Sequence, residues 1–407
     1  MELRKHKLGD LIDVTRGASL SGEYYAEEGE LIRLTLGNFN MNGGGFKENT
    51  SKTDLYFTGE VRDEFILDEG DIITPLTEQS LGLLGTTARI PESGKYIQSQ
   101  DVALVKCKDG MLDPNFCYYL ISSQIVRQQL SAAAQQTKIR HTSPDKIKDC
   151  TVWTPSLDNQ KKIGRILTDI DAKIALNRQI NHNLEAMAKQ LYDYWFVQFD
   201  FPNAEGKPYK SSGGKMIWNE KLKREIPEGW NSITIGETLD KVISTPRLST
   251  NEYLPLGRYP IIDQTTDVYY AGFTDRQDAV VNQYPAVVFG DHSCAVKYVN
   301  FPFVRGADGT QVILSQNDSI STEYLYLAIQ KIKIGKGYAR HFSFLKQQPI
   351  IVPSNRIAYN FKYMIRLLFE KVTQNREEIL QLTKQRDELL PLLMNGQATV
   401  NYDLSAC

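Results

Sequence analysis

Apolar residues recur every three or four positions along two long stretches of the chain. Each position of the second series lies 198 residues after its counterpart in the first. The mean step of 3.5 residues is the period of a coiled-coil seam. The pattern therefore predicts two long helices with one register. The positions are Ile163, Leu167, Ile170, Ile174, Asn177, Asn181, Leu184, Ala188, Leu191 and Trp195, then Phe361, Ile365, Leu368, Val372, Asn375, Ile379, Leu382, Arg386, Leu389 and Leu393.

Start and stop signals bound both helices. Asp158 is a start signal for the first, Pro202 follows its end, and Gly396 follows the end of the second. We expect the helices within residues 157–198 and 357–396. Each is then roughly 35 to 39 residues long, or about 50 to 58 Å at 1.5 Å per residue.

Asn177 and Asn375 occupy equivalent seam positions. A buried polar residue in a seam lowers stability while it fixes register and partner. We expect the helices to pair with each other as an intramolecular antiparallel coiled coil with a pseudo-two-fold axis. The alternative is that both Asn side chains are solvated at a frayed seam.

The regions before the helices, residues 1–156 and 227–356, share an order of features. In each, a strand-like run, V-A-L-V-K or Q-V-I-L, precedes a short helix, and an Arg-His pair follows at 140–141 or 340–341. The fold class predicted is α+β, with two similar mixed α/β domains separated by the long helices. Residues 199–226, rich in Gly, Pro, Ser and Lys, are expected to be a linker, and 397–407 a tail.

Composition narrows the class of protein. The 407 residues are 41% hydrophobic and 24% charged, with a net charge of -2, as in an ordinary globular protein. The five cysteines form no C-x-x-C pair and are expected to be free thiols. The charged N-terminus and the lack of a long apolar run predict a cytoplasmic protein with no membrane partner.

Basic residues concentrate at the same place in each half, in 127–148 and 331–346. Arg and Lys suit phosphate oxygens, and a Gly-rich run such as G-K-G-Y at 335–338 lets a backbone approach closely. A solvated surface is the alternative for each stretch. The residues of these stretches proposed to contact DNA are Lys138, Arg140, His141, Lys336, Tyr338, Arg340 and His341.

Other loop-like stretches contain side chains suited to base edges, because Arg pairs with guanine and Asn or Gln with adenine through paired hydrogen bonds. Each such residue could instead cap a turn. The candidates are Arg16, Asn38, Asn40, Thr77, Glu78, Gln79, Ser80, Arg247, Gln264, Asp291 and His292.

Catalytic motifs are incomplete. D-P-N-F at 113–116 has Asn where an adenine methyltransferase tetrad has Pro, and Asp-Pro is also a helix start. No G-x-x-x-x-G-K-[ST] nucleotide loop is present. E-G-K at 205–207 has the form of a nuclease signature, but its acidic partner Asp200 is too near in sequence. We assign no catalytic residue, cofactor or metal ligand.

These features together resemble the DNA specificity subunits of type I restriction-modification systems. The resemblance covers nearly the whole chain, and the order and duplication of its motifs are more specific than any one of them. The stretches that carry it are L-I-R-L-T-L-G-N-F-N (31–40), E-G-D-I-I-T-P-L (69–76), I-Q-S-Q-D-V-A-L-V (97–105), 136–148, 158–180, Y-P-I-I-D-Q (259–264), G-D-H-S-C-A-V-K-Y (290–298), 303–312, 337–346 and L-L-P-L-L-M-N-G-Q (389–397).

The resemblance implies a non-catalytic subunit whose two target-recognition domains each recognise half of a split DNA sequence. It also implies that the helices set the spacer and bind two methyltransferase subunits, and that ATP-driven restriction subunits join the complex. Two alternatives remain open at this point. The chain could serve a type II system with a fused nuclease-methylase partner, or it could be a coiled-coil interaction scaffold.

Overall fold

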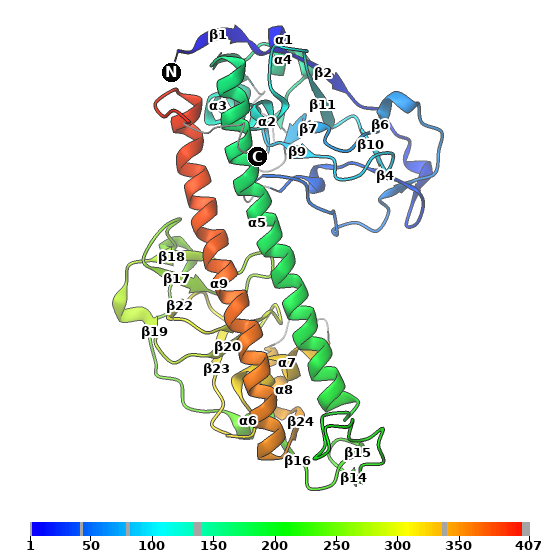
Figure 1. The fold of residues 1–407 in the computed structure, drawn as a ribbon, viewed down its shortest axis with the longest axis vertical. Coiled ribbons are helices and arrows are strands. Elements are labelled where there is room, and N and C mark those ends of the chain that lie inside the picture. The colour runs from blue at the N-terminus through cyan, green and yellow to red at the C-terminus, as the bar shows by residue number, and fades with distance from the viewer. Residues whose placement is uncertain (1, 41–43, 79–81, 134–139, 336–339, 401–407) are drawn as a thin grey trace. The chain divides into compact units, whose positions relative to one another are not determined.

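The computed structural model describes residues 2–40, 44–78, 82–133, 140–335 and 340–400. The chain divides into two compact units. Unit 1 consists of Met1–Leu176 and Glu378–Cys407, and unit 2 of Asn177–Glu377. The long helices α5 (Leu157–Tyr192) and α9 (Asn355–Met394) each contribute a segment to both units (Figure 1). Each unit therefore joins one globular domain to one segment of each long helix.

The globular domain of unit 1 is a set of short sheets packed on helices. Its β1 and β13 pair antiparallel, one sheet has the order β2-β11-β7-β9, and another has the order β3-β5-β4-β10-β6. The elements are β1 (Arg4–Lys7), α1 (Leu8–Leu11), β2 (Ile12–Arg16), β3 (Tyr25–Ala26), β4 (Leu31–Arg33), β5 (Tyr56–Phe57), β6 (Ile66–Leu67), β7 (Ile72–Pro75), β8 (Thr77–Glu78), β9 (Ala88–Arg89), β10 (Tyr96–Ile97), β11 (Val102–Cys107), α2 (Pro114–Ser122), α3 (Gln124–Ala133), β12 (Arg140–His141), α4 (Pro144–Lys148) and β13 (Thr151–Thr154).

Unit 2 repeats this order. Its β16 and β24 pair antiparallel as β1 and β13 do, and the parallel pair β17 and β22 matches β4 and β10. The elements are β14 (Met216–Asn219), β15 (Arg224–Pro227), β16 (Asn231–Thr234), α6 (Ile235–Thr238), β17 (Tyr259–Ile262), β18 (Gly272–Thr274), β19 (Val280–Val281), β20 (Ala286–Gly290), β21 (Val296–Val299), β22 (Phe303–Arg305), β23 (Thr310–Ile313), α7 (Thr322–Lys331), α8 (His341–Gln347) and β24 (Pro349–Val352).

The helices α5 and α9 pair within each unit. In unit 1, Asp171 and Lys173 of α5 contact Arg386 and Glu378 of α9, so rising numbers in α5 meet falling numbers in α9. In unit 2, the contacts of Asn181 with Asn375 and of Trp195 with Phe361 run the same way. The pairing is antiparallel, and every predicted seam position is buried or partly buried. The predicted fold class is confirmed.

The polar contact in the seam differs from the expected one. Asn177 and Asn375 are both 2% exposed, which excludes the solvated alternative. The side chain of Asn375, however, donates to Asn181. Antiparallel pairing explains the shift, because a residue and its counterpart 198 positions later do not lie directly opposite each other.

Residues 199–226, expected to be a linker, are folded onto unit 2. After α5, residues Asp193–Val197 form a π-helical turn, and Phe199 and Phe201 are then buried in the core of the unit. The ring of Phe201 stacks on that of Trp230 with centroids 4.7 Å apart. The strands β14 and β15 form a hairpin. Aromatic side chains hold this segment despite its Gly- and Ser-rich composition, because their burial removes a large apolar area from water.

The described cysteines Cys107, Cys117, Cys150 and Cys294 are free thiols, as expected. Among the helices in the described ranges, none combines the length and apolar character needed to cross a bilayer.

Candidate DNA interface

In unit 1, the strands β8 and β12 bring two predicted segments together. Thr77 lies opposite His141, and Glu78 lies opposite Arg140, in an antiparallel pair. His141 is exposed, whereas Thr77 is buried at 7% exposure. These segments are more than 60 residues apart in sequence, so the fold rather than local sequence places them side by side.

Among the residues of β8 and β12, Glu78 makes the most side-chain hydrogen bonds. It is 2% exposed, and its Oε2 atom accepts hydrogen bonds from the backbone N–H groups of Gly82, Leu83 and Leu84 at 3.0 to 3.1 Å. Its Oε1 atom lies 3.1 Å from Nη1 of Arg140. The carboxylate therefore holds a loop on one side and a cation on the other.

Arg140 has internal partners in this arrangement, and its contact with DNA stays a prediction. Its side chain is 19% exposed, and besides the pair with Glu78 its Nη2 atom donates to the backbone carbonyl and to the hydroxyl of Ser131. These internal partners occupy the guanidinium and neutralise its charge. Arg140 is thus a structural cation, and His141 beside it is the exposed member of the segment.

Asn38 also has internal partners. It is 2% exposed, its Oδ1 atom accepts from the backbone and hydroxyl of Thr35, and its Nδ2 atom donates to the carbonyl of Lys47. The side chain closes a turn and presents no amide edge to a base. Asn40 is partly buried and pairs through its backbone with Gly45, while Arg16 is exposed at the end of β2.

In unit 2, several predicted residues converge although they are distant in sequence. Nε2 of Gln264 donates to the carbonyl of Asp308 at 2.8 Å, and Oε1 of Gln264 accepts from the backbone N–H of His292 at 3.2 Å. Nη1 of Arg247 lies 4.0 Å from the carboxylate of Asp308. Arg247 is exposed and Gln264 and His292 are partly exposed, so the cluster forms a polar surface.

Asp291 belongs to the support of this surface. It is 6% exposed, its carboxylate accepts from the backbone N–H of Phe342 at 2.8 Å, and its carbonyl accepts from that of His341 at 3.0 Å. It therefore caps α8, and its predicted contact with a base stays a prediction. His341 is 8% exposed, whereas Arg340, the N-cap residue of α8, is exposed.

Glycines make the close packing of the cluster possible. A Cβ atom on Gly290 would lie 2.3 Å from Oγ of Ser293 and 2.7 Å from Cβ of Gln264. Gly309 has a φ of +81°, a conformation that other residues rarely adopt, and a Cβ there would lie 2.7 Å from the ring of His292. Both positions require glycine to let Gln264 and His292 approach.

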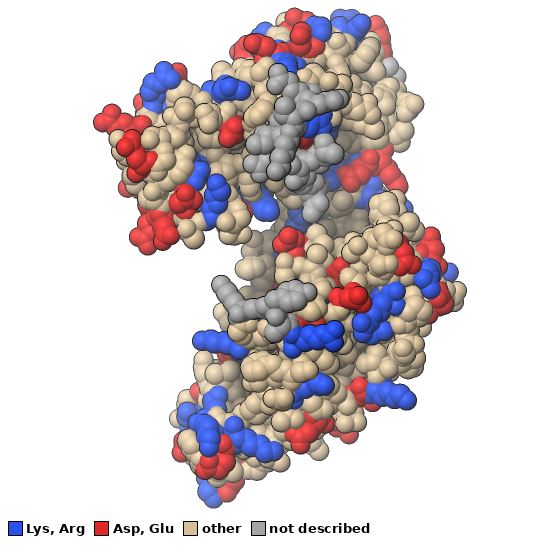
Figure 2. Space-filling view, turned by 180° about the vertical axis from the view of Figure 1, so that it is seen from behind, with Lys and Arg blue, Asp and Glu red and all other residues tan. Residues whose placement is uncertain are grey.

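The expected contacts Gln79, Ser80, Lys138, Lys336 and Tyr338 lie outside the described residues. Some of the remaining basic side chains have internal partners. Nζ of Lys146 donates to the carbonyl of Ala133, Lys148 pairs with Asp145, and Lys331 pairs with Asp193. Figure 2 shows Lys and Arg interspersed with Asp and Glu on the visible faces. Any attraction for DNA is local, which agrees with the small net charge.

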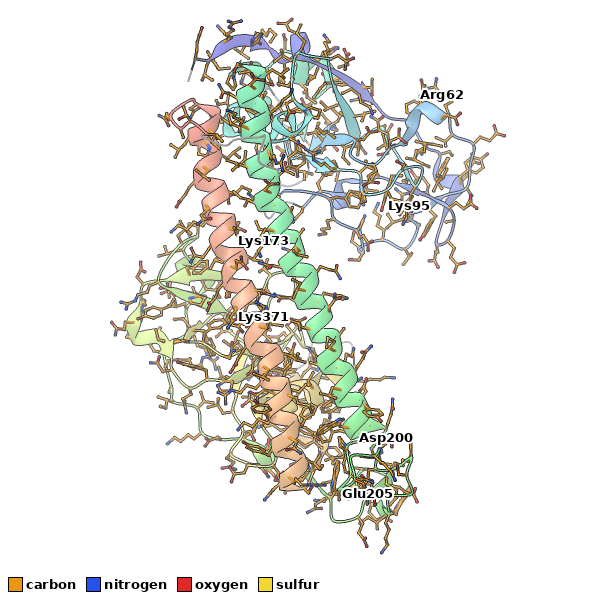
Figure 3. All side chains as sticks on the ribbon, in the orientation of Figure 1. Arg62, Lys95, Lys173, Asp200, Glu205 and Lys371 are labelled. Atoms are coloured by element: carbon orange, nitrogen blue, oxygen red, sulfur yellow. The ribbon has the colours of Figure 1, made fainter. Side chains whose placement is uncertain are left out.

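The incomplete catalytic motifs have structural roles. The carboxylate of Asp113 accepts from the N–H of Phe116 at 2.9 Å and caps α2. Asp200 accepts from the backbone and hydroxyl of Ser211, and Glu205 forms an ion pair with Lys207 at 3.0 Å. Figure 3 shows Asp200 and Glu205 in the segment after α5, and Lys173 and Lys371 at equivalent positions of α5 and α9.

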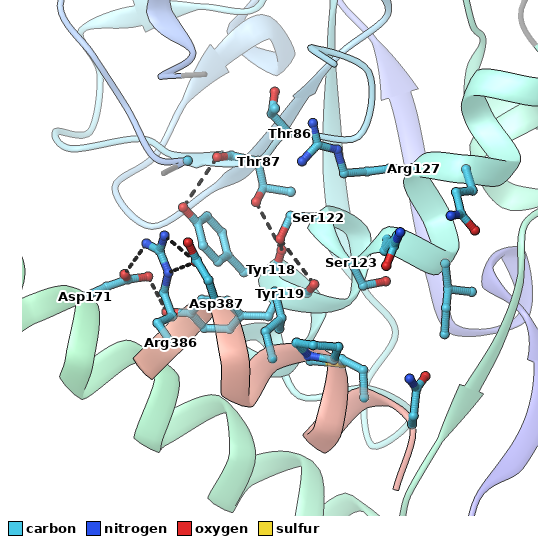
Figure 4. A pocket seen from close by; sticks show the side chains of 18 residues that line it. Thr86, Thr87, Tyr118, Tyr119, Ser122, Ser123, Arg127, Asp171, Arg386 and Asp387 are labelled. Atoms are coloured by element: carbon cyan, nitrogen blue, oxygen red, sulfur yellow. Dashed lines mark hydrogen bonds and ion pairs between the residues drawn. The ribbon is translucent and has the colours of Figure 1, made fainter. Parts of the chain in front are cut away.

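A cavity of about 590 Å³ in unit 1 lies where α2 and α3 meet the helix pair. Arg386 of α9 lines it and pairs with Asp171 of α5 at 2.8 Å, and Asp171 also accepts from the hydroxyl of Tyr119 at 2.6 Å (Figure 4). Burial raises the pKa of Tyr119, and the neighbouring Asp171 raises it further. These polar groups bond to one another. We therefore assign them a structural role at the junction of the globular domain and the helices.

Sequence reasoning missed Asp308 and Arg386. Asp308 lies within 303–312, one of the stretches that carry the resemblance, but nothing in the local sequence marks its contacts with Arg247 and Gln264. Arg386 did leave a signal, because it is a charged residue in an otherwise apolar or Asn seam, and such a residue needs a buried partner.

Two α+β domains, each with an Arg-His segment and each joined to a long helix, define a duplicated protein. The family model of the type I restriction modification DNA specificity domain matches residues 2–186 and 227–379. The chain belongs to this family. Each matched stretch contains one globular domain and part of a long helix.

Two individual relatives support this family assignment. The type I restriction enzyme MjaIX specificity subunit of Methanocaldococcus jannaschii is 24% identical over 317 residues, 72% of this chain and 71% of that protein. The HindI specificity subunit of Haemophilus influenzae is 24% identical over 375 residues, 74% of this chain and 81% of that protein.

Among solved structures, the type I restriction-modification S subunit from M. genitalium has a TM-score of 0.60 at 18% identity, over 97% of this chain and 96% of that one. It shares the fold. Together these comparisons confirm the interpretation as a type I DNA specificity subunit and do not favour the type II or scaffold alternatives.

Proposed function

We propose that the globular domain of each unit recognises one half of a bipartite DNA target, and that the chain contributes no catalytic step of its own. The observation that supports this most is the polar surface of unit 2. Arg247, Gln264 and His292 come from separate segments and meet beside the α8 segment that begins at the exposed Arg340. The amide of Gln264 keeps one N–H and one lone pair beyond its internal bonds, which suits a base edge.

Arg340 provides the first test. Its replacement in Arg340→Ala should weaken binding of the complete complex to DNA and reduce the salt slope by about 0.9 for each phosphate that the protein no longer neutralises. The size of this weakening should change when the half-site bound by unit 2 is altered. It should stay the same when the half-site bound by unit 1 is altered. Arg258→Ala, another exposed arginine of the same unit, is the matched control. Equal loss of discrimination at both half-sites would refute independent recognition.

We assign the distance between the half-sites to the helices, because α5 and α9 both continue from one unit into the other. Seven residues inserted between Leu176 and Asn177, and seven between Glu377 and Glu378, leave the contacts inside each unit in place. The insertion adds two turns, or about 10.5 Å, which corresponds to about three base pairs.

Long-read methylation profiling of cells with this variant and its methyltransferase measures the result. The half-site sequences should stay the same and the unread spacer should change. Seven residues inserted in the exposed turn between β14 and β15 should leave the target unchanged, since that hairpin lies outside the helices. An unaltered spacer in the helix variant would show that the helices do not set the distance between the half-sites.

A row of exposed apolar side chains on α9 supports docking of methyltransferase subunits, of which we propose two, with restriction subunits completing the complex. Tyr359, Tyr363 and Leu367 are 70%, 63% and 53% exposed and lie four residues apart on one face. Aromatic residues on a surface are enriched at protein interfaces. The counterparts on α5, 198 positions earlier, are Lys161, Arg165 and Asp169, so this row belongs to α9 alone of the two helices.

A further inference from the structure

Each recognition domain has a buried acidic residue just after an internal strand of a sheet. In unit 1, Glu78 follows β7, and its carboxylate accepts from the N–H groups of Gly82, Leu83 and Leu84 while it pairs with Arg140. A buried carboxylate is costly to desolvate unless donors surround it, and charge-assisted bonds are stronger than neutral ones. Glu78 therefore holds the backbone at 82–84 firmly.

Arg140, the partner of Glu78, also connects this arrangement to a third segment, α3. Arg140 bonds the carboxylate from β12 and also donates to the backbone carbonyl and the hydroxyl of Ser131 near the end of α3. The strand pair β8 and β12 then leaves the neighbouring His141 exposed. One carboxylate thus determines where an exposed histidine and a loop lie relative to each other.

In unit 2, Asp291 has the corresponding place directly after β20. Its carboxylate accepts from the N–H of Phe342, its carbonyl accepts from that of His341, and its own N–H donates to the carbonyl of Gly309. The contacted segment again contains Arg-His, here at 340–341. The chemistry differs between a charge pair and a helix cap, but the segment that is held is the same.

We propose that Glu78 and Asp291 are positioning residues, each of which sets the specificity of its own half-site without touching DNA. This inference rests on the proposed function. Specific base contacts require side chains held to within a fraction of an ångström by their supporting groups. Loops vary more than the elements they connect, so a domain that recognises DNA with loops needs such support.

Glu78→Gln tests unit 1. The amide has nearly the same volume, but its NH₂ must face either the loop N–H groups or Arg140, which are all donors. Asp291→Ala is the change in unit 2, because it removes the oxygen that accepts from Phe342, whereas an Asn side chain would keep an acceptor there. The matched controls are Glu64→Gln and Asp278→Ala, because Glu64 and Asp278 form exposed ion pairs with Arg62 and Arg276.

The assay uses the complex with its methyltransferase subunits and three duplexes: the target found by methylation profiling, and the same target with one base pair changed in either half-site. The wild type should discriminate against each change by about 10-fold or more. Glu78→Gln should reduce discrimination at the unit 1 half-site to under about 3-fold and leave the other intact. Asp291→Ala should do the reverse, and both controls should match the wild type.

A merely structural role would lower affinity for the three duplexes in proportion and leave both ratios unchanged. Arg140→Gln is a second variant in case Glu78→Gln does not fold, because it leaves the three amide bonds of Glu78 in place. It should lose discrimination at the same half-site. If Glu78 acts through Arg140, the double variant Glu78→Gln/Arg140→Gln should lose no more discrimination than the single variant with the larger loss.

The outcomes separate the two hypotheses. If the wild type does not discriminate at two half-sites, the proposed function fails. If it does, and folded Glu78→Gln or Arg140→Gln and folded Asp291→Ala keep both ratios, the positioning role is wrong while the function stands.

Discussion

The side-chain nitrogen of Asn375 donates a hydrogen bond to the side-chain oxygen of Asn181 at 2.9 Å, between α9 and α5 in unit 2. Asn181 in turn donates to the backbone carbonyl of Val372 at 3.3 Å. Both side chains are nearly inaccessible to solvent, at 2% and 7% exposure. A polar pair in an apolar seam stabilises one register, because any shift leaves both amides without partners.

Replacing one of these two asparagines should therefore lower the free energy of unfolding more than replacing both. Asn375→Leu leaves the Asn181 oxygen buried without its donor and should lower the free energy of unfolding by about 1 to 3 kcal/mol. The double variant with Asn181→Leu should recover most of this loss. Urea unfolding followed by circular dichroism measures both. Asn183→Leu, at an exposed position of the same helix, is the control and should change stability by less than about 0.5 kcal/mol.

Arg386 should matter more than surface cations of the helices. Its side chain is 10% exposed, and Arg386→Met would leave Asp171 without its cation, at a cost on the order of 3 kcal/mol. Lys173→Met removes a pair with Glu378 whose side chains are 48% and 44% exposed, and should cost less than about 1 kcal/mol. Thermal unfolding of the two variants in parallel compares them. Similar losses would show that burial does not govern these pairs.

Alkaline pH should unfold the protein through buried tyrosines of unit 2. Burial raises the pKa of Tyr270 to about 12 and that of Tyr326 to about 12, above the value of about 10 expected in an unfolded chain. Below pH 10 both states keep these protons. Between about pH 10 and 12 the unfolded state loses protons that the folded state keeps, so stability falls as pH rises, by up to about 1.4 kcal/mol per pH unit for each tyrosine.

Urea unfolding at pH 9, 10 and 11 measures this slope, and absorbance at 295 nm shows whether tyrosinate forms with unfolding. Tyr326→Phe removes one of the groups and should flatten the slope above pH 10. A slope identical to that of the wild type would exclude this tyrosine as a cause.

The helices and the duplication were predictable because they follow from periodicity. A seam of 3.5 residues specifies which faces pair, and residues such as Ile163 and Phe361 are buried as expected. The partner of Asn375 was not predictable at the same level, since a period gives the face but leaves the exact stagger of antiparallel helices open. Arg386 required knowledge of Asp171 on the other helix.

The candidate site was predictable as a set of regions and less so as individual roles. Asn38 and Gln264 are similar amides in polar turns, and either could cap a turn or contact a base. Their roles diverge only through distant partners, since Asn38 closes a buried turn with Lys47 while Gln264 joins Asp308 and His292 at a partly exposed surface. Local sequence contains no information on such partners.

The exposed row Tyr359, Tyr363 and Leu367 leads to a prediction about assembly. Changing all three to Ser removes apolar surface that is already in contact with water, so the stability of the chain should change little. Association with a methyltransferase subunit should weaken, because burial of these side chains at an interface would contribute most of its apolar energy.

Native mass spectrometry of the co-expressed complex counts the subunits. With α5 carrying Lys161, Arg165 and Asp169 at the equivalent positions, the triple variant should lose one of the two methyltransferase copies that we propose and retain the other. Met111→Ser, which alters an exposed apolar residue outside the helices, should retain both. Retention of both copies by the triple variant would show that this face of α9 is not the docking surface, and loss of both would show that the two copies do not bind independently.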